Sequence, residues 1–160
     1  MSDLVTLLVF SAGSTQSDAE RLVTEARHAI TADVIARVRA LGLVERIVVA
    51  TDSHALAETL QPFDVVVDYD APSAPFAFGA RLAQVVERYS VRKAFYVGGG
   101  AGALLSDDEW RLVVDRLRAD DNVLIPNNLW SSDFVAFAPA NAALDLPILS
   151  SDNNLAFLLR

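Results

Sequence analysis

Short apolar runs alternate with longer segments of helical periodicity along this chain, and the alternation limits the possible folds more than any other feature. Residues 4–10 are apolar except for Thr6, which is typical of a strand buried on both faces of a sheet. After a small polar loop, Ser17 and Glu20 have the spacing of a capping box. Apolar residues then recur about every four positions, which predicts a helix that ends near Leu41 before Gly42, unless Thr31 and Asp33 divide it.

The same alternation continues to the end of the chain. Further strands are predicted at residues 46–50, 65–67, 94–97, 123–125 and 133–138. Helices are predicted at residues 53–60, 78–89, 106–117 and 152–160. Strands that alternate with helices pair in parallel through right-handed crossovers. The sequence therefore predicts one α/β domain over residues 1–160, a Rossmann-like three-layer sandwich with a mainly parallel sheet. Because an apolar helical run reaches the last residue, the chain is either a whole domain or the N-terminal part of a longer one.

Composition excludes several kinds of site. The chain has no cysteine and two histidines, so disulfides, thiolate zinc sites and cysteine nucleophiles are ruled out. The formal net charge of -8 argues against binding to nucleic acid or to an anionic membrane. The longest apolar run is too short to span a bilayer and lacks the features of a signal peptide, so we expect a soluble, cytoplasmic protein. Lys93 is the only lysine.

Two loops rich in small residues each follow a predicted buried strand. Residues 11–16 follow the first strand, and residues 98–102, four of them glycine, follow the fourth. Ligands of parallel sheets bind at the carboxyl ends of the strands, where backbone N–H groups can receive an anion. If the two strands are neighbours, the loops face each other, and the candidate ligand residues are Ser11, Ala12, Gly13, Ser14, Gly98, Gly99 and Gly100. The alternatives are a tight turn for the first loop and a flexible hinge for the second.

Several acidic and polar residues have two interpretations. Asp68 and Asp70 have the spacing of an acidic pair that holds a divalent cation against a phosphate, although capping of a turn before Pro72 is favoured. Asp52 is expected to be a helix N-cap, and His54 a solvated surface residue. In the segment 130–133, the tryptophan packs either over a ligand or over the core. The pair 127–128 and residues 152–154 either contact sugar or base hydroxyls or terminate strands and cap helices.

The order of these pieces resembles a known family. The residues that carry the resemblance are Ala12-Gly13, Val49-Ala50-Thr51-Asp52, Gly79-Ala80-Arg81-Leu82, Phe95-Tyr96-Val97-Gly98 and Leu104-Leu105-Ser106. Together they resemble the GT-A-like nucleotidyltransferases, which include the molybdenum-cofactor and phospholactate guanylyltransferases, over most of the chain to about Ala138. The resemblance implies a nucleotide-diphospho-sugar transferase-like fold and a small-molecule nucleotide or nucleotide sugar as ligand, with Mg²⁺ or Mn²⁺. It also implies that Ser11, Ala12 and Gly13 cradle the base and phosphates, that Gly79 allows close approach of the nucleoside, and that the region of Gly98 faces the metal and phosphates.

The chain departs from the family pattern at its charged positions. The first loop lacks the family's arginine and lysine, for which Arg21 and Arg27 on the following helix are conceivable substitutes. Gly98, Gly99 and Gly100 stand where the family has a metal-binding aspartate. Three hypotheses follow: a nucleotidyltransferase-like domain with little or no turnover, a non-catalytic binding or regulatory relative, and a metal-dependent glycosyltransferase that uses Asp68 and Asp70. The catalytic residues, the base, the acceptor and the oligomeric state are left unassigned.

Overall fold

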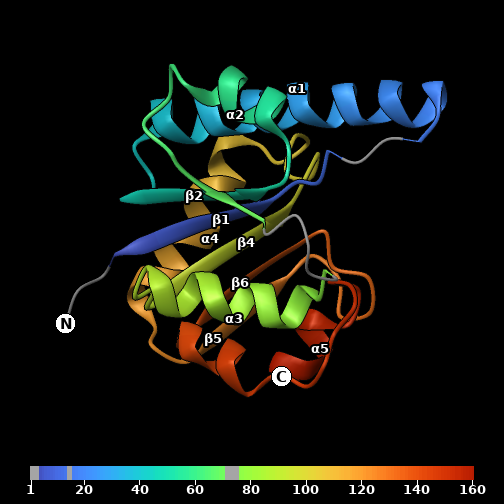
Figure 1. Ribbon diagram of the computed structural model, residues 1–160. Helices are drawn as coiled ribbons and strands as arrows, with labels where there is room; N and C mark the ends of the chain where they lie inside the picture. Colours follow the sequence, from blue (N-terminus) through green and yellow to red (C-terminus); the bar gives the residue numbers. More distant parts are fainter. Residues whose placement is uncertain (1–3, 14–15, 71–75) are drawn as a thin grey trace.

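A computed structural model describes residues 4–13, 16–70 and 76–160 (Figure 1). Its centre is a six-stranded sheet in the order β3-β2-β1-β4-β6-β5. The strands are β1 (Val5–Phe10), β2 (Arg46–Thr51), β3 (Val66–Tyr69), β4 (Lys93–Gly98), β5 (Val123–Pro126) and β6 (Phe134–Ala138). The helices are α1 (Asp18–Leu41), α2 (His54–Leu60), α3 (Phe78–Arg88), α4 (Asp107–Ala119), α5 (Leu155–Leu159) and the 3-10 helix η1 (Ala140–Asp145). The predicted α/β class is confirmed.

The sheet is mainly parallel, as expected, but its last two strands differ. β1 pairs in parallel with both β2 and β4, and β2 pairs in parallel with β3. β6 runs antiparallel to β4 and to β5, because no helix lies between β5 and β6 to carry the chain back to the start of the sheet. Phe10 of β1 is level with Ala50 of β2 and with Gly98 of β4, so three strands end at the same edge of the sheet.

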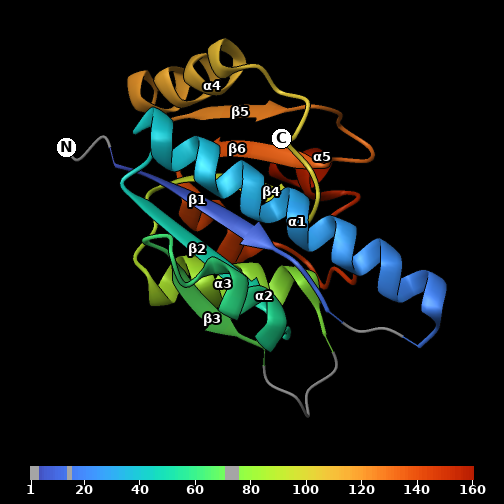
Figure 2. The ribbon, with the colours of Figure 1, turned by 90° about the horizontal axis from the view of Figure 1, so that it is seen from above.

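Helices cover both faces of the sheet, as Figures 1 and 2 show. Side chains of a strand alternate between the faces, so Leu7 and Val9 of β1 face α1, α2 and α4, whereas Leu8 and Phe10 face α3, η1 and α5. All four are at most 9% exposed, and the two faces form separate apolar clusters. The three-layer arrangement predicted from the sequence is therefore present.

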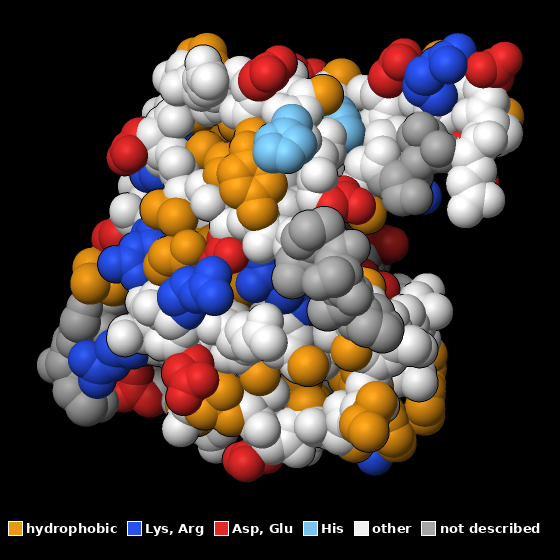
Figure 3. Space-filling view, in the orientation of Figure 1, with side chains coloured by type: hydrophobic (Ala, Val, Ile, Leu, Met, Phe, Trp, Pro, Cys, Tyr) orange, Lys and Arg blue, Asp and Glu red, His pale blue; other side chains and the backbone are white. Residues whose placement is uncertain are grey.

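Helix α1 is longer than the sheet that it covers. It runs unbroken for 24 residues from a capping box at Ser17 to Gly42, which has the left-handed conformation (φ 63°) that glycine favours. Thr31 does not divide the helix, because its side chain is buried against the glycine loop and accepts a hydrogen bond from Gly100 N. Every buried residue of α1 lies at or after Thr31, and the first half projects beyond the sheet with charged side chains at its tip (Figure 3).

Two other elements differ from the sequence prediction. β3 extends through Asp68 and Tyr69, which were expected to begin a loop, because both continue the parallel pairing with β2. The last helix begins only at Leu155, three residues later than predicted. In the described ranges, no helix is both long enough and apolar enough to cross a membrane.

Candidate functional site

The two small-residue loops meet at the carboxyl ends of β1 and β4, as predicted for neighbouring strands. Gly99 N donates a hydrogen bond to Phe10 O over 2.7 Å. A Cβ atom on Gly99 would lie 2.6 Å from Ser11 Oγ, which is closer than real Cβ contacts. The loops are therefore packed against each other, with no cleft between them at this point. Ser14, another candidate, lies outside the described residues.

The expectation that the loop amides receive an anion is wrong for most of them, because the protein uses them itself. Gly98 N donates to Asp133 O, Gly100 N to Thr31 Oγ1, and Ala101 N to Gly98 O. Gly13 N donates to Asp52 Oδ1 over 2.6 Å, so Asp52 anchors the first loop, and Ser53 caps α2 in its place. Gly100 and Gly102 have φ angles of 85° and 82°, a conformation that favours glycine, and they also lie against Arg27 and Trp110.

Two hollows flank this junction, and both are lined by Phe10, Tyr96 and Asp152. The larger, of about 710 Å³, lies on the side of β4 and β6 and is also lined by Arg27, Ile30, residues 98–105, Asn127, Asp133 and Phe134. The smaller, of about 230 Å³, lies on the side of β1 and β2 and is also lined by Ser11, Ala12, Ala50, Asp70, Phe76, Phe78, Ser150 and Ser151. The predicted residues of the first loop thus line the smaller hollow, and those of the second loop line the larger one. Both hollows lie in one region of the surface.

Two acidic residues, Asp133 and Asp152, lie beside the end of β4. Tyr96 is 2% exposed, and its hydroxyl donates to Asp152 Oδ2 over 2.7 Å. The same Oδ2 lies 3.5 Å from the place where a Cβ atom of residue 98 would be. Asp133 accepts the Gly98 amide on its carbonyl and an Asn127 Nδ2 bond of 3.1 Å on its carboxylate. The space that a side chain at position 98 would occupy is therefore bordered by the Asp152 carboxylate, which comes from the segment before α5.

Tyr96 stays protonated in this environment. Burial, followed by the negative charge of Asp152, raises the pKa of Tyr96 well above its ordinary value. Its hydroxyl is therefore a permanent donor to the carboxylate at physiological pH. Sequence reasoning missed Tyr96 because it stands in an apolar strand, although a buried tyrosine hydroxyl needs a polar partner. Asp133 and Asp152 were named as polar loop residues, but their common place beside the larger hollow was not foreseen.

Arg27 supplies a positive charge to the larger hollow. It lies on the projecting part of α1, and a Cβ atom on Gly100 would lie 3.1 Å from its Cγ. Within the ranges that the structure describes, its guanidinium makes no ion pair or hydrogen bond. Arg21, the other predicted substitute, pairs with Asp18 over 2.9 Å and lines neither hollow. Of the two arginines, only Arg27 lines the candidate site.

Asp68 and Asp70 face arginines of α3. Arg81 Nη2 lies 3.0 Å from Asp68 Oδ1, and Arg81 Nε lies 2.6 Å from Asp70 Oδ1. Arg88 Nη1 binds both carboxylate oxygens of Asp68. These bonds occupy both carboxylate oxygens of Asp68 and Oδ1 of Asp70. No group of three or more potential metal ligands is found anywhere among the described residues. The pair therefore links β3 to α3. The turn before Pro72 that Asp68 and Asp70 were expected to cap lies outside the described residues.

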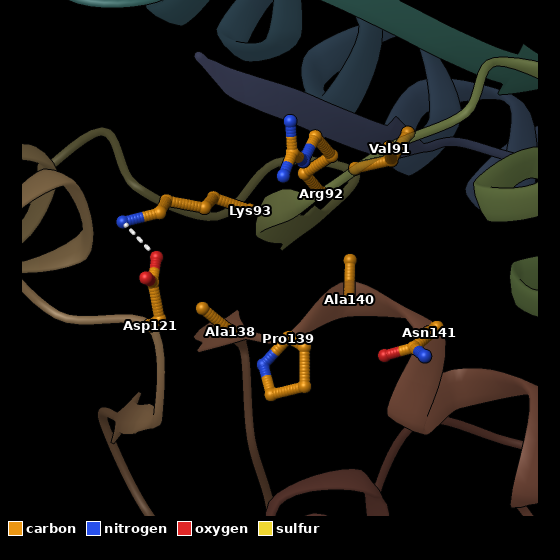
Figure 4. A pocket seen from close by; sticks show the side chains of 8 residues that line it. All are labelled: Val91, Arg92, Lys93, Asp121, Ala138, Pro139, Ala140 and Asn141. Carbon is orange, nitrogen blue, oxygen red and sulfur yellow. Dashed lines mark ion pairs between the residues drawn. The ribbon is translucent and has the colours of Figure 1, made fainter. Parts of the chain in front are cut away.

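Gly79 and Lys93 also lie outside the candidate site. A Cβ atom on Gly79 would lie 3.2 Å from Leu149 Cβ and from Pro147 O, so the segment that contains Pro147 and Leu149 packs closely against this glycine. Lys93 starts β4 at the opposite edge of the sheet, beside a cavity of about 390 Å³ (Figure 4). Its Nζ binds three backbone carbonyls at the end of α4 and the Asp121 carboxylate, so the only lysine serves as a helix cap.

Comparison with solved structures identifies the architecture. A cytidylyltransferase from Leptospira borgpetersenii superposes with a TM-score of 0.65 at 15% identity, covering 94% of this chain and 67% of that one. A nucleotidyl transferase from Methanothermobacter gives 0.64 at 16% identity, covering 99% and 81%. The chain shares the fold of these two proteins. The fold that the sequence resemblance implies is therefore confirmed.

A third structure shows how the lengths compare. CMP:2-keto-3-deoxy-manno-octonic acid synthetase, solved in complex with CTP, gives a TM-score of 0.54 at 10% identity. The match covers 85% of this chain but only 65% of the synthetase, so this chain spans less than two thirds of that protein. No family model and no curated protein matches the sequence.

Proposed function

We propose that this domain binds a nucleotide or nucleotide sugar across the two hollows at the carboxyl ends of β1 and β4. The observation that carries the proposal is that Arg27, Asp133 and Asp152 line one hollow, at the edge of a nucleotidyltransferase fold where ligands of parallel sheets bind. One similar structure is a synthetase complexed with CTP, which supports a nucleotide as the ligand class.

The two hollows suit different parts of a nucleotide. The larger is lined by Arg27, and a guanidinium binds phosphate oxygens with charge-assisted hydrogen bonds. The smaller is lined by the aromatic rings of Phe76 and Phe78 and by the hydroxyl groups of Ser11, Ser150 and Ser151. Aromatic rings stack on bases, and hydroxyl groups bind sugar and base edges. We therefore assign the phosphates to the larger hollow and the nucleoside to the smaller.

A divalent cation fits the same region. Asp133 and Asp152 offer the carboxylate oxygens that Mg²⁺ and Mn²⁺ prefer, and Asp152 borders the space that a side chain at Gly98 would enter. We propose that these two residues hold the cation that accompanies the nucleotide. When bound, such a cation neutralises charge on phosphate oxygens.

Catalytic turnover is proposed to be slow or absent. Phosphoryl transfer depends on several positioned positive charges, and each tenfold in rate corresponds to about 1.4 kcal/mol of barrier. Among the described residues that line the hollows, Arg27 is the only cationic side chain. A binding or regulatory role is therefore the second candidate. The glycosyltransferase hypothesis is not carried forward, because Asp68 and Asp70 are engaged by Arg81 and Arg88.

Isothermal titration with CTP, GTP, ATP, UTP and nucleotide sugars, with and without Mg²⁺, tests the proposal. The variant Arg27→Gln should weaken binding of the preferred nucleotide by about tenfold to a hundredfold, since a hydrogen bond to a charged group contributes about 1.5–3 kcal/mol. Arg21→Gln is the matched control, because Arg21 lies on the same helix but outside the hollow, and it should bind like the unsubstituted chain. Equal binding by the two variants, or no binding of any nucleotide, would contradict the proposal.

A further inference from the structure

The Tyr96 side chain is fixed on all sides. It stands in the middle of β4 and is 2% exposed, yet it borders both hollows. Its ring makes edge contacts with Phe10 and Phe78, with ring centroids 5.6 Å and 5.2 Å apart. Its hydroxyl has one hydrogen-bond partner among the described residues, the carboxylate of Asp152 at 2.7 Å. The phenol is therefore a rigid donor that points to one carboxylate.

Among the described side chains, the Asp152 carboxylate has this hydroxyl as its one hydrogen-bond partner. Asp152 belongs to the segment between η1 and α5, and its carbonyl accepts the amide of Leu155 at the start of α5. That bond fixes the backbone but leaves the side chain free to rotate. Among the described side chains, only the Tyr96 hydroxyl binds its carboxylate, and it binds Oδ2 alone. The second oxygen, Oδ1, therefore keeps its capacity to bind a cation while the side chain is held.

We propose that Tyr96 is a positioning residue that holds the Asp152 carboxylate in the orientation required to bind the divalent cation. The inference rests on the proposed function and adds a residue to it. Tyr96 reaches the cation through Asp152 and contacts no phosphate. Residue 98 is glycine and cannot supply a carboxylate to the cation. Instead, β4 contributes the Tyr96 hydroxyl as a hydrogen-bond donor, and Asp152, from the segment before α5, contributes the carboxylate that binds the cation.

The expected size of the effect follows from known metal sites. Hydrogen bonds to a metal-binding carboxylate contribute about 10-fold to 100-fold to metal affinity. Tyr96→Phe removes only the hydroxyl and keeps the ring contacts with Phe10 and Phe78. We therefore expect the Mn²⁺ dissociation constant of Tyr96→Phe to rise by about tenfold or more. Asp152→Asn, which removes the ligand itself, should raise it further.

Electron paramagnetic resonance titration with Mn²⁺ alone, on the full chain, measures these affinities without any assay of activity. The set comprises the unsubstituted chain, Tyr96→Phe, Asp152→Asn and the double variant, with Tyr69→Phe as control. Tyr69 is 47% exposed at the end of β3 and lines neither hollow, so its variant should bind Mn²⁺ normally. If Tyr96 acts through Asp152, Tyr96→Phe should have no further effect in the Asp152→Asn background.

Each outcome decides the inference. The inference is overturned if Tyr96→Phe and Tyr69→Phe bind Mn²⁺ with equal affinity. It is also overturned if Tyr96→Phe lowers Mn²⁺ affinity equally in the unsubstituted chain and in Asp152→Asn, because the hydroxyl would then act on packing alone. Absence of Mn²⁺ binding by the unsubstituted chain overturns both this inference and the proposed cation, whereas nucleotide binding is decided separately by Arg27→Gln. If Tyr96→Phe does not fold, the tyrosine difference absorbance of the unsubstituted chain on adding Mg²⁺ replaces it. A change that Asp152→Asn abolishes supports the inference, and no change overturns it.

Discussion

Replacing Asp68 with asparagine should destabilise the fold without affecting ligand binding. Asp68 is 4% exposed and accepts hydrogen bonds from Arg81 at 3.0 Å and from Arg88 at 2.8 Å. Asparagine keeps the shape of the side chain but removes its charge, so two arginines lose their shared partner. Arg81 retains Asp70 at 2.6 Å.

The magnitude follows from the burial of the pair. Removing one partner of a buried ion pair costs about 3–5 kcal/mol, since it leaves an uncompensated charge in the interior. Arg81 keeps its bond to Asp70, and the Arg88 side chain is 57% exposed, so the lower end applies. We therefore expect a loss of about 3 kcal/mol in the free energy of unfolding. For a domain of this size, that corresponds to a melting temperature about 6–12 °C lower.

The loss should depend on pH. Burial by itself would raise the pKa of Asp68, but hydrogen bonds from Arg81 and Tyr89 and the charges of Arg81 and Arg88 outweigh it, and the pKa is lowered. A carboxyl group with a lowered pKa in the folded state contributes stability above its unfolded value of about 3.9, and loses it as the pH falls through the folded value. The difference in stability between the unsubstituted chain and Asp68→Asn should be full at neutral pH and shrink below about pH 4.

Urea denaturation from neutral to acidic pH tests this prediction. Asp64→Asn is the matched control, because the Asp64 side chain is 98% exposed and lies 3.5 Å from Arg39, an arrangement that contributes less than about 1 kcal/mol. The reasoning is refuted if Asp68→Asn is no less stable than the control at neutral pH, or if the difference does not change with pH. Nucleotide binding should be unaffected by Asp68→Asn, and a lost metal-dependent affinity would restore the hypothesis of an acidic metal pair.

Two further substitutions test the packing roles of residues that attracted functional interpretations. Gly99→Ala should lower the free energy of unfolding by about 1–3 kcal/mol, measured in urea, because its Cβ would lie 2.6 Å from Ser11 Oγ. Adding Ser11→Gly should recover part of this loss. If the losses of the two substitutions simply add, the contact does not cause the destabilisation. Lys93→Met should lower the free energy of unfolding by about 2–4 kcal/mol in the same assay, because it removes the donor to three backbone carbonyls at the end of α4. Nucleotide affinity should not change, because Lys93 lies at the far edge of the sheet. Unchanged stability would mean that the lysine does not cap α4.

Local rules predicted the elements well. The capping boxes at Ser17 and Ser106 and the glycine after Leu41 define helix ends within a few neighbouring residues, and the structure has all three. The pairing of β1 with β4 was a correct hypothesis, because the two small-residue loops make sense only at one edge of the sheet. The start of α5 was misjudged, because its sequence carries no capping signal.

The site was predictable only in part. The region, Arg27 and the two loops were named from the sequence, and the structure brings them together. The state of the loop amides was not predictable, because their acceptors, Asp133 O and Thr31 Oγ1, come from segments far along the chain. The role of Asp68 was not predictable for the same reason. Its spacing with Asp70 is typical of a metal-binding pair, and only the structure shows that Arg81 and Arg88 lie beside it.

The sequence by itself determined the α/β alternation, the strands buried on both faces and the absence of cysteine chemistry, because each depends on residue type and on periodicity over a few neighbours. Only the tertiary structure decided which polar groups line the two hollows and which are already hydrogen-bonded within the protein. Asp152, 54 positions from Gly98, lies between η1 and α5 and comes close to the end of β4, and no local pattern records that contact. Ion pairs and hydrogen bonds join residues that are close in space but far apart in the sequence. Packing therefore determined which polar groups at the carboxyl ends of β1 and β4 are already paired.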